Sequence, residues 1–302
     1  MRIKQRLAAY LAAAVGLLAC AGCSRTPTLS NEITFSLAGV SEITISYDEE
    51  SVTFYENQRD ELTVKEYMTE YQRGYCARTS QSGGGIRVSE GGKPLFSGGF
   101  SRRVEVYLPS SYRGDLTVTT TDGDIALFGL QLSVDALRVD SAAGAVRLGA
   151  AAADSIHLST TSGSLSADRL NAAAIRIDTT SGSFSCERLE GAVAFTTTSG
   201  NAEVASAVGS GSYRASNSGQ LQVVYTEVTG DLTFQNKNGG VHVTLPSDLA
   251  FDFEAATKNG SISTTFQECL SAQDKTLRGT VGSHPAVTVK AETTNGSIEV
   301  TR

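Results

Sequence analysis

The sequence predicts an all-β protein: a β-solenoid (β-helix-like) of rungs about 19 residues long, with an N-terminal cap of β-strands. Three observations predict this fold class. A glycine-centred unit recurs along most of the chain, the composition favours strands and turns, and the segment before the repeat alternates apolar with polar residues. The clearest copy of the unit is Ile175–Cys186, IRIDTTSGSFSC.

Each copy of the unit is counted from its glycine, which is Gly182 in this example. Apolar residues stand at positions −7, −5, +2 and mostly +4, and Ser, Thr or Asn stands at −3. Because alternate residues of a strand share a face, these positions predict a continuous core and an inward ladder of hydroxyl and amide groups. The phase recurs at Gly123, Gly144, Gly163, Gly200, Gly219, Gly239, Gly260 and Gly296.

The repeated glycine has two possible reasons, a positive φ or a close approach to the next rung. Two irregularities also need explaining. In the rung of Gly219, Tyr213 and Ala215 stand one residue away from the apolar phase, which predicts a one-residue bulge. Between Gly260 and Gly296 the interval doubles, so either a rung has drifted or residues 266–285 form an excursion loop.

Composition narrows the class of protein further. Thirty glycines, two methionines and no tryptophan among 302 residues, with many Ser, Thr and Val, predict short strands and almost no helix. The formal net charge is −7. That balance argues against DNA, RNA or anionic lipid as the main partner.

The first 23 residues have the layout of a secretory signal: basic residues, an apolar run and small residues. The run LLACAGCS resembles the lipobox of bacterial lipoproteins, with Cys23 or Cys20 as the lipidated residue. Alternatives are a cleaved signal with incidental cysteines, or a short membrane anchor. We expect an extracytoplasmic protein held at the bacterial cell membrane by an N-terminal lipid, with residues 24–31 as a polar tether.

The sequence predicts that residues 32–110 form the cap and that residues 111–302 form the repeat region. The two are expected to make one continuous domain. The expected strands of the cap are 33–37, 42–47, 51–55, 62–64, 85–89 and 103–109.

Three longer segments resemble a known family. They are VEVYLPSSYRGDLTVTTTDGDI at 104–125, VHVTLPSDLAFDFEAATKNGSIS at 241–263 and VTVKAETTNGSIEV at 287–300. Together with the TTSGS rungs they resemble the DUF4097 family, whose bacterial members carry the label "putative adhesin", over roughly residues 33–302. The resemblance implies an extracytoplasmic β-solenoid without a catalytic motif.

The residues themselves predict no catalytic centre, no metal site and no cofactor. Asp140 and Asp178 stand at outward parity and indicate solvated surface, and the three histidines, His157, His242 and His284, share no phase. Cys186 stands at an apolar +4 position and is expected to be a buried small residue. Cys76 and Cys269 lie in irregular segments, where pairing is one possibility.

The sequence therefore favours a non-enzymatic envelope protein, an adhesin or surface-binding scaffold whose partner is an envelope protein, a glycan or another surface. The alternative is an accessory regulator of an envelope-stress signalling system, and a third hypothesis is a glycan-acting β-helix enzyme. Binding residues are expected in the segments that escape the period, 83–99 and 266–285. The second contains the candidates Lys275, Arg278 and His284.

Overall fold

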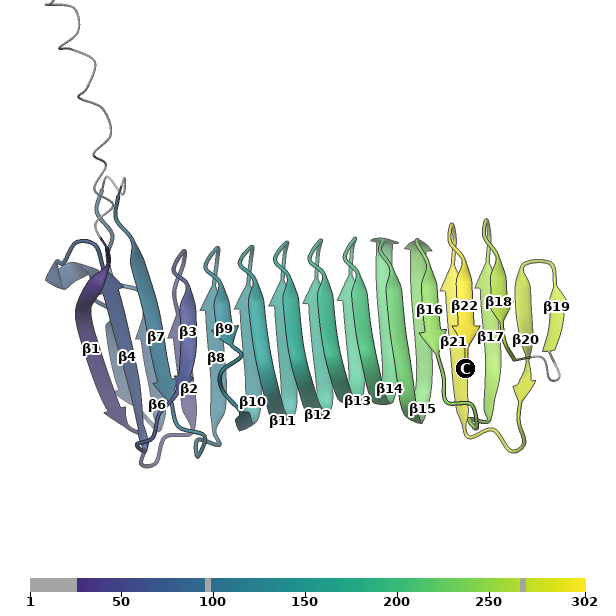
Figure 1. Ribbon diagram of the computed structural model, residues 1–302, viewed down its shortest axis with the longest axis horizontal. Helices are drawn as coiled ribbons and strands as arrows, with labels where there is room; N and C mark the ends of the chain where they lie inside the picture. The colour runs from purple at the N-terminus through teal and green to yellow at the C-terminus, as the bar shows by residue number, and fades with distance from the viewer. Residues whose placement is uncertain (1–25, 96–98, 267–269) are drawn as a thin grey trace, which may run out of the picture.

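The computed structural model describes residues 26–95, 99–266 and 270–302 as a row of parallel, bent rungs stacked in one direction (Figure 1). These ranges contain 22 β-strands, one 3-10 turn at Arg73–Tyr75 and no α-helix, so the all-β prediction is confirmed. No described helix is long and apolar enough to cross a membrane.

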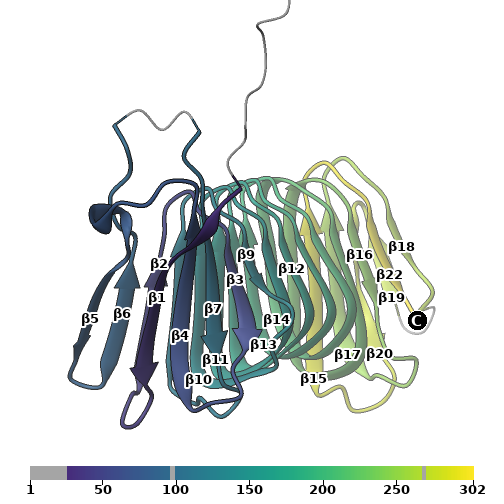
Figure 2. The same ribbon diagram turned by 60° about the vertical axis from the view of Figure 1, so that its left-hand side comes forward.

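A typical rung is one strand that bends along its length and ends in a tight turn (Figure 2). β12 pairs in parallel with β11 and β13, so that Ile175 lies between Ile156 and Val193. The rung strands are β8 (Asp115–Thr120), β9 (Ile125–Leu127), β10 (Leu132–Ser141), β11 (Val146–Thr160), β12 (Leu165–Thr179), β13 (Phe184–Thr197), β14 (Ala202–Ser218) and β15 (Leu221–Asn238).

The predicted inward positions form the core: Ile175, Ile177, Leu165 and their equivalents are at most a few per cent exposed. A further apolar stripe, which the sequence reading did not identify, lies where each long strand bends. It consists of Ala151, Leu170, Ala172, Leu189, Ala207 and Tyr225. Each rung therefore buries three apolar segments.

Close approach, and not backbone conformation, explains the repeated glycine. A Cβ on Gly182 would lie 2.1 Å from the carbonyl oxygen of Gly163, and the same overlap recurs at Gly200 against Gly182. Neither Gly182 nor Gly200 has a positive φ. Successive turns stack so tightly that no side chain fits between them.

The inward ladder at −3 is present, and its groups mostly satisfy the turn backbone. Thr120 donates to the Gly123 carbonyl over 2.7 Å, and Thr197 accepts from the Gly200 amide over 2.7 Å. The ladder is interrupted once, because Ala215 lies opposite Thr197 and Asn236 while Ser216 is exposed. The predicted bulge is therefore confirmed, with the register shift between Ala215 and Ser218.

The last rung of the chain lies between two earlier ones. β21 pairs in parallel with β15 on one side and β17 on the other, and β22 lies between β16 and β18 in the same way. The spatial order of the glycines is therefore Gly239, Gly296, Gly260. The strands are β16 (Val241–Thr244), β17 (Phe251–Thr257), β18 (Ile262–Thr264), β21 (Val287–Thr293) and β22 (Ile298–Thr301).

The doubled interval before Gly296 is neither a drifted rung nor an excursion loop. It contains β19 (Leu270–Gln273) and β20 (Thr276–Val281), which pair antiparallel, and β20 also pairs antiparallel with β17. This hairpin closes the C-terminal end of the sheet, with Val281 buried.

The N-terminal end is interleaved in the same manner. The rung of β2 and β3 lies between the rung of β6 and β7 and the rung of β8 and β9. β4 and then β1 continue the sheet antiparallel beyond β7, and β5 lies antiparallel to β6. The strands are β1 (Thr28–Ser36), β2 (Glu42–Ser46), β3 (Val52–Glu56), β4 (Glu61–Met68), β5 (Arg78–Ser82), β6 (Gly85–Ser89) and β7 (Arg102–Leu108).

Two expected boundaries differ from this arrangement. β1 begins at Thr28, so residues 28–31 of the expected tether belong to the sheet. Rungs stacked in the repeat pattern already begin at Glu42, so the division between cap and repeat does not fall at residues 110 and 111. The antiparallel strands β1, β4 and β5 are the true cap.

Candidate functional site

The three candidate residues of the C-terminal segment do not form one site. Lys275 lies in the turn between β19 and β20, where its Nζ donates to the Gly260 carbonyl over 3.0 Å. Arg278 lies within β20 and pairs with Glu254. His284 lies beyond the far end of β20, exposed and with φ 56°. The three are spread along the hairpin from the turn before β20 to the residues after it, and Lys275 lines a groove.

That groove, of about 670 Å³, runs across four stacked rungs beside their turns. Four of its side chains are cationic and exposed: Arg214, Lys237, Lys258 and Lys275. We call it the basic groove. It is completed by Ala215, Ser216, Gln235, Asn236, Ala256, Thr257, Glu292, Thr293 and Thr294.

Strand register places two lysines of the basic groove in one row. Lys237 and Lys258 both stand at position −2, and the interleaved rung puts Thr294 between them. The sequence signal is the change from TSG-type turns to NKNG at 236–239 and TKNG at 257–260. The sequence analysis missed it because it expected binding residues only in the segments that escape the repeat, and both lysines stand inside repeat units.

The charges of the basic groove are not neutralised from within. Among the described residues, Arg214, Lys237 and Lys258 make no ion pair. The one carboxylate in the lining, Glu292, pairs with Lys290 over 2.9 Å. The groove therefore has a net positive charge on a chain whose formal net charge is −7.

A ladder of asparagines borders the basic groove at the turns. Asn238 donates to the carbonyl of Asn217 over 2.8 Å, Asn295 donates to Asn238 over 2.6 Å, and Asn259 donates to Asn295 over 2.7 Å. These hydrogen bonds between asparagine side chains and the neighbouring turns run from rung to rung, and they hold the turns that carry Lys237 and Lys258.

One outward stripe of the central rungs is different, because its charges are paired. Arg138 pairs with Asp140, and Arg176 pairs with Asp178. His157 bridges the two pairs, with Nδ1 2.7 Å from Arg138 Nη1 and Nε2 3.0 Å from Asp178 Oδ2. Because Arg138 can only donate, His157 accepts at Nδ1 and donates to Asp178 from Nε2. Asp140 and Asp178 form surface ion pairs, while His157 has partners that its position in the repeat did not reveal.

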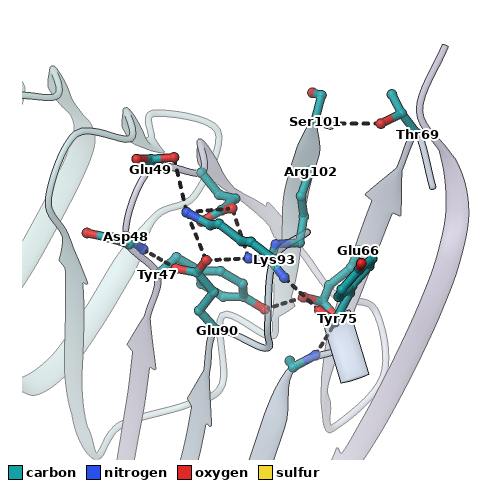
Figure 3. A network of polar contacts seen from close by, with 12 residues as sticks. Tyr47, Asp48, Glu49, Glu66, Thr69, Tyr75, Glu90, Lys93, Ser101 and Arg102 are labelled. Atoms are coloured by element: carbon teal, nitrogen blue, oxygen red, sulfur yellow. Dashed lines mark hydrogen bonds and ion pairs between the residues drawn. The ribbon is translucent and has the colours of Figure 1, made fainter. Parts of the chain in front are cut away.

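A second polar cluster lies at the N-terminal end of the stack (Figure 3). By register, Glu50 and Arg102 occupy the turn position that Gly123 holds in the next rung, and Tyr47 and Glu90 occupy the −3 position. The Arg102 side chain is fully buried; its Nη2 donates to Glu50 over 2.9 Å and also to Glu90.

Lys93 ties the segment after β6 to this N-terminal cluster, with Nζ 3.0 Å from Glu90 and 3.1 Å from Glu49. Burial lowers the pKa of Lys93, but hydrogen bonds to Glu90 and Glu49 and the charge of Glu50 outweigh burial and hold the pKa above its ordinary value. Burial, reinforced by the adjacent Glu66 carboxylate, raises the pKa of Tyr47 well above its ordinary range.

The N-terminal cluster is enclosed by its own partners. Glu66 is fully buried and accepts hydrogen bonds from Tyr47, Asn31 and the Ala77 amide. These bonds join β4 to β1, to the residue after β2 and to the residue before β5. The cluster therefore supports the fold, whereas the cations of the basic groove are exposed to solvent.

The cysteines fall into two groups. Cys186 is buried, and burial raises its thiol pKa to about 12, as expected for a core residue. Cys76 is a free thiol at the N-terminal end, whereas β19, which begins at Leu270, lies at the opposite end (Figure 1). Cys20, Cys23 and Cys269 lie outside the described residues. Across the described ranges, no group of His, Cys, Asp or Glu is arranged to hold a metal ion.

Fold and groove together define a class of protein: a stack of parallel β-rungs with interleaved ends and an open basic groove near one end. The chain belongs to the Toastrack DUF4097 family, whose model matches residues 40–301, and the expected membership is confirmed. None of the curated proteins matches it.

Several solved structures of bacterial proteins are similar to this chain over most of its length. A "putative adhesin" of Parabacteroides distasonis is 14% identical (TM-score 0.46; 89% of this chain and 96% of that chain covered). One of Parabacteroides merdae is 11% identical (0.45; 89% and 95%), and a "putative cell adhesion protein" of Clostridium sporogenes is 10% identical (0.23; 90% and 98%). Likenesses of this degree carry no statement about function.

Proposed function

We propose that this chain is a non-enzymatic, lipid-anchored scaffold of the bacterial cell envelope that binds a surface partner through its basic groove. The observation that carries the proposal is the position of the groove. It lies on the rungs of Gly219, Gly239, Gly296 and Gly260, toward the opposite end of the stack from β1, where the described chain begins (Figure 1). A chain tethered near β1 holds the groove away from the membrane.

The stacked architecture supports a presenting role. Each rung is bonded to its neighbours along its whole length, and glycine contacts between turns leave no room for one rung to slide on the next. Such a body keeps a fixed distance between its ends. In the adhesin version of this proposal, the surface partner lies outside the cell.

The anchor is tested by metabolic labelling with a fatty-acid probe. We expect the full chain to be labelled and the label to vanish in either Cys23→Ala or Cys20→Ala, which identifies the modified residue. Complete release of the unlabelled protein into the medium, with both cysteines intact, would show that the lipoprotein proposal is wrong.

Binding is tested by co-sedimentation of the detergent-solubilised full chain with washed cell-wall fragments. We expect Lys237→Gln/Lys258→Gln to lose binding, and the matched variant Arg147→Gln/Arg169→Gln, which removes two exposed cations of other rungs, to retain it. Equal binding by both variants would contradict a role for the groove. Capture of a membrane sensor protein, with no affinity for the wall fragments, would favour the envelope-stress regulator instead.

A further inference from the structure

We infer that the basic groove binds an anionic polysaccharide lying along the stacking axis, with its charged groups held by Lys237 and Lys258. This inference rests on the proposed function, since it names the partner of the same groove. It follows from the charge of the groove, the spacing of its cations and the chemistry of its lining.

The charge of the groove requires a negatively charged ligand. Lys237 and Lys258 are exposed and without ion pairs among the described residues, and Glu292 is engaged by Lys290. The Lys275 amine is held beside the same row by the Gly260 carbonyl. An anion that enters the groove can pair with these cations without breaking an existing salt bridge.

The spacing of the cations favours a chain over a small anion. Lys237 and Lys258 lie two rungs apart, with the rung of Thr294 between them. At about 4.8 Å per rung, equivalent positions on those rungs lie about 10 Å apart. A single carboxylate or phosphate group contacts both amines only when the two side chains bend toward each other, whereas an extended polymer with repeated anionic groups meets both in their extended positions and gains from two linked contacts.

The lining favours carbohydrate over protein or nucleic acid. Between the cations it presents hydroxyl and amide groups, including Ser216, Gln235 and Thr294, and no aromatic side chain. Protein interfaces depend on aromatic or other apolar anchors, and single-stranded nucleic acid needs aromatic platforms for its bases. Within the described ranges, the exposed large hydrophobic residues lie elsewhere, at Leu29, Tyr55, Tyr71, Leu95 and Phe128. Sugar hydroxyls match the hydrogen-bonding groups that the groove offers.

The negative groups of such a polysaccharide are carboxylates or phosphates, and both suit a lysine. Binding to the full chain in detergent is therefore measured by titration calorimetry with polygalacturonate, phosphorylated dextran and neutral dextran. We expect binding to at least one charged polymer, weakened by added salt, and none to neutral dextran. The better of the two charged polymers identifies the anionic group.

The variants locate the site. Lys237→Gln/Lys258→Gln should weaken binding of the charged polymer by about tenfold, as the loss of two exposed charge contacts implies, and Arg147→Gln/Arg169→Gln should leave it within about twofold. Unchanged melting temperatures establish that both variants are folded. Equal affinity for neutral dextran, or equal weakening by both variants, would overturn the inference. So would wall binding without affinity for any charged polymer, a result that leaves the proposed surface binding intact.

Discussion

Glu50 and Arg102 face each other from neighbouring rungs at the turn position that glycine holds elsewhere, with Arg102 Nη2 2.9 Å from Glu50 Oε1. A glycine turn stacks by backbone contact alone. Here a buried ion pair replaces that contact, and it lets the outermost turn widen into the segment that carries Lys93. The N-terminal end of the stack thus depends on a buried ion pair in place of the glycine contacts between the turns of the central rungs.

Removing one partner of this pair should be costly. Arg102→Met leaves Glu50 and Glu90 facing a buried apolar side chain, and we expect a loss of about 3–5 kcal/mol in the free energy of unfolding. Urea denaturation measures it. Arg138→Met, which breaks an exposed pair, is the control and should cost no more than about 1 kcal/mol. Similar losses in the two variants would mean that the buried pair has no special role.

The stacking glycines predict a strong effect from a single methyl group. In Gly182→Ala the new Cβ overlaps the Gly163 carbonyl oxygen, so we expect a loss of about 2 kcal/mol or more, although the φ of Gly182 suits any residue. Gly74→Ala is the matched control, because nothing lies within 4 Å of its added Cβ. Thermal melts that rank the two variants in the opposite order would refute the stacking explanation.

Inward and outward parity can be separated at adjacent residues. Ile177 is fully buried, so Ile177→Asp places an unpaired charge in the core and should cost more than about 4 kcal/mol, enough to prevent folding. Asp178→Ala removes only a partly exposed partner of Arg176 and His157, and we expect a change below about 1 kcal/mol. Circular dichroism melts decide between them.

The Cys186 thiol should be unreactive in the native protein. Burial raises its pKa to about 12 and leaves it 3% exposed, so iodoacetamide at pH 8 should modify it only after unfolding, whereas the partly exposed Cys76 should react in the native state. Site-resolved mass spectrometry distinguishes them. Rapid native modification of Cys186 would contradict its place in the core.

The same pKa shift predicts a pH dependence. Above about pH 8.5 the thiol ionises in the unfolded chain but not in the folded one, so the unfolded state binds fewer protons and stability falls as the pH rises toward 12. Cys186→Ala removes this contribution. Its melting temperature should therefore decline less than that of the wild type between pH 8 and pH 10, and an identical decline would show that the thiol is not protected.

Much of the fold follows from the sequence because the repeat is local. The residues from Leu165 to Cys186 carry apolar residues at alternate positions and a turn glycine. Both features depend only on the equivalent positions of the two adjacent rungs. The third apolar stripe was missed because Leu170 and Ala172 lie where the strand bends, outside the phase counted from Gly182.

The order of the rungs could not be read in the same way. Pairing β15 with β21 rather than β17 depends on contacts between residues more than 50 positions apart, such as Asn295 with Asn238. The basic groove depends on that order, since the interleaved rung places Glu292, Thr293 and Thr294 between the rungs of Lys237 and Lys258. Of the candidate binding residues Lys275, Arg278 and His284, only Lys275 lines the basic groove.

The most direct test of the central claim is hydrogen–deuterium exchange of the full chain with and without the charged polysaccharide that it binds best. The account predicts new protection in the turns at residues 235–240, 256–261 and 292–297, with the central rungs around Gly163 unchanged. Protection confined to the central rungs, or to the segment around Lys93, would show that the basic groove is not where the partner binds.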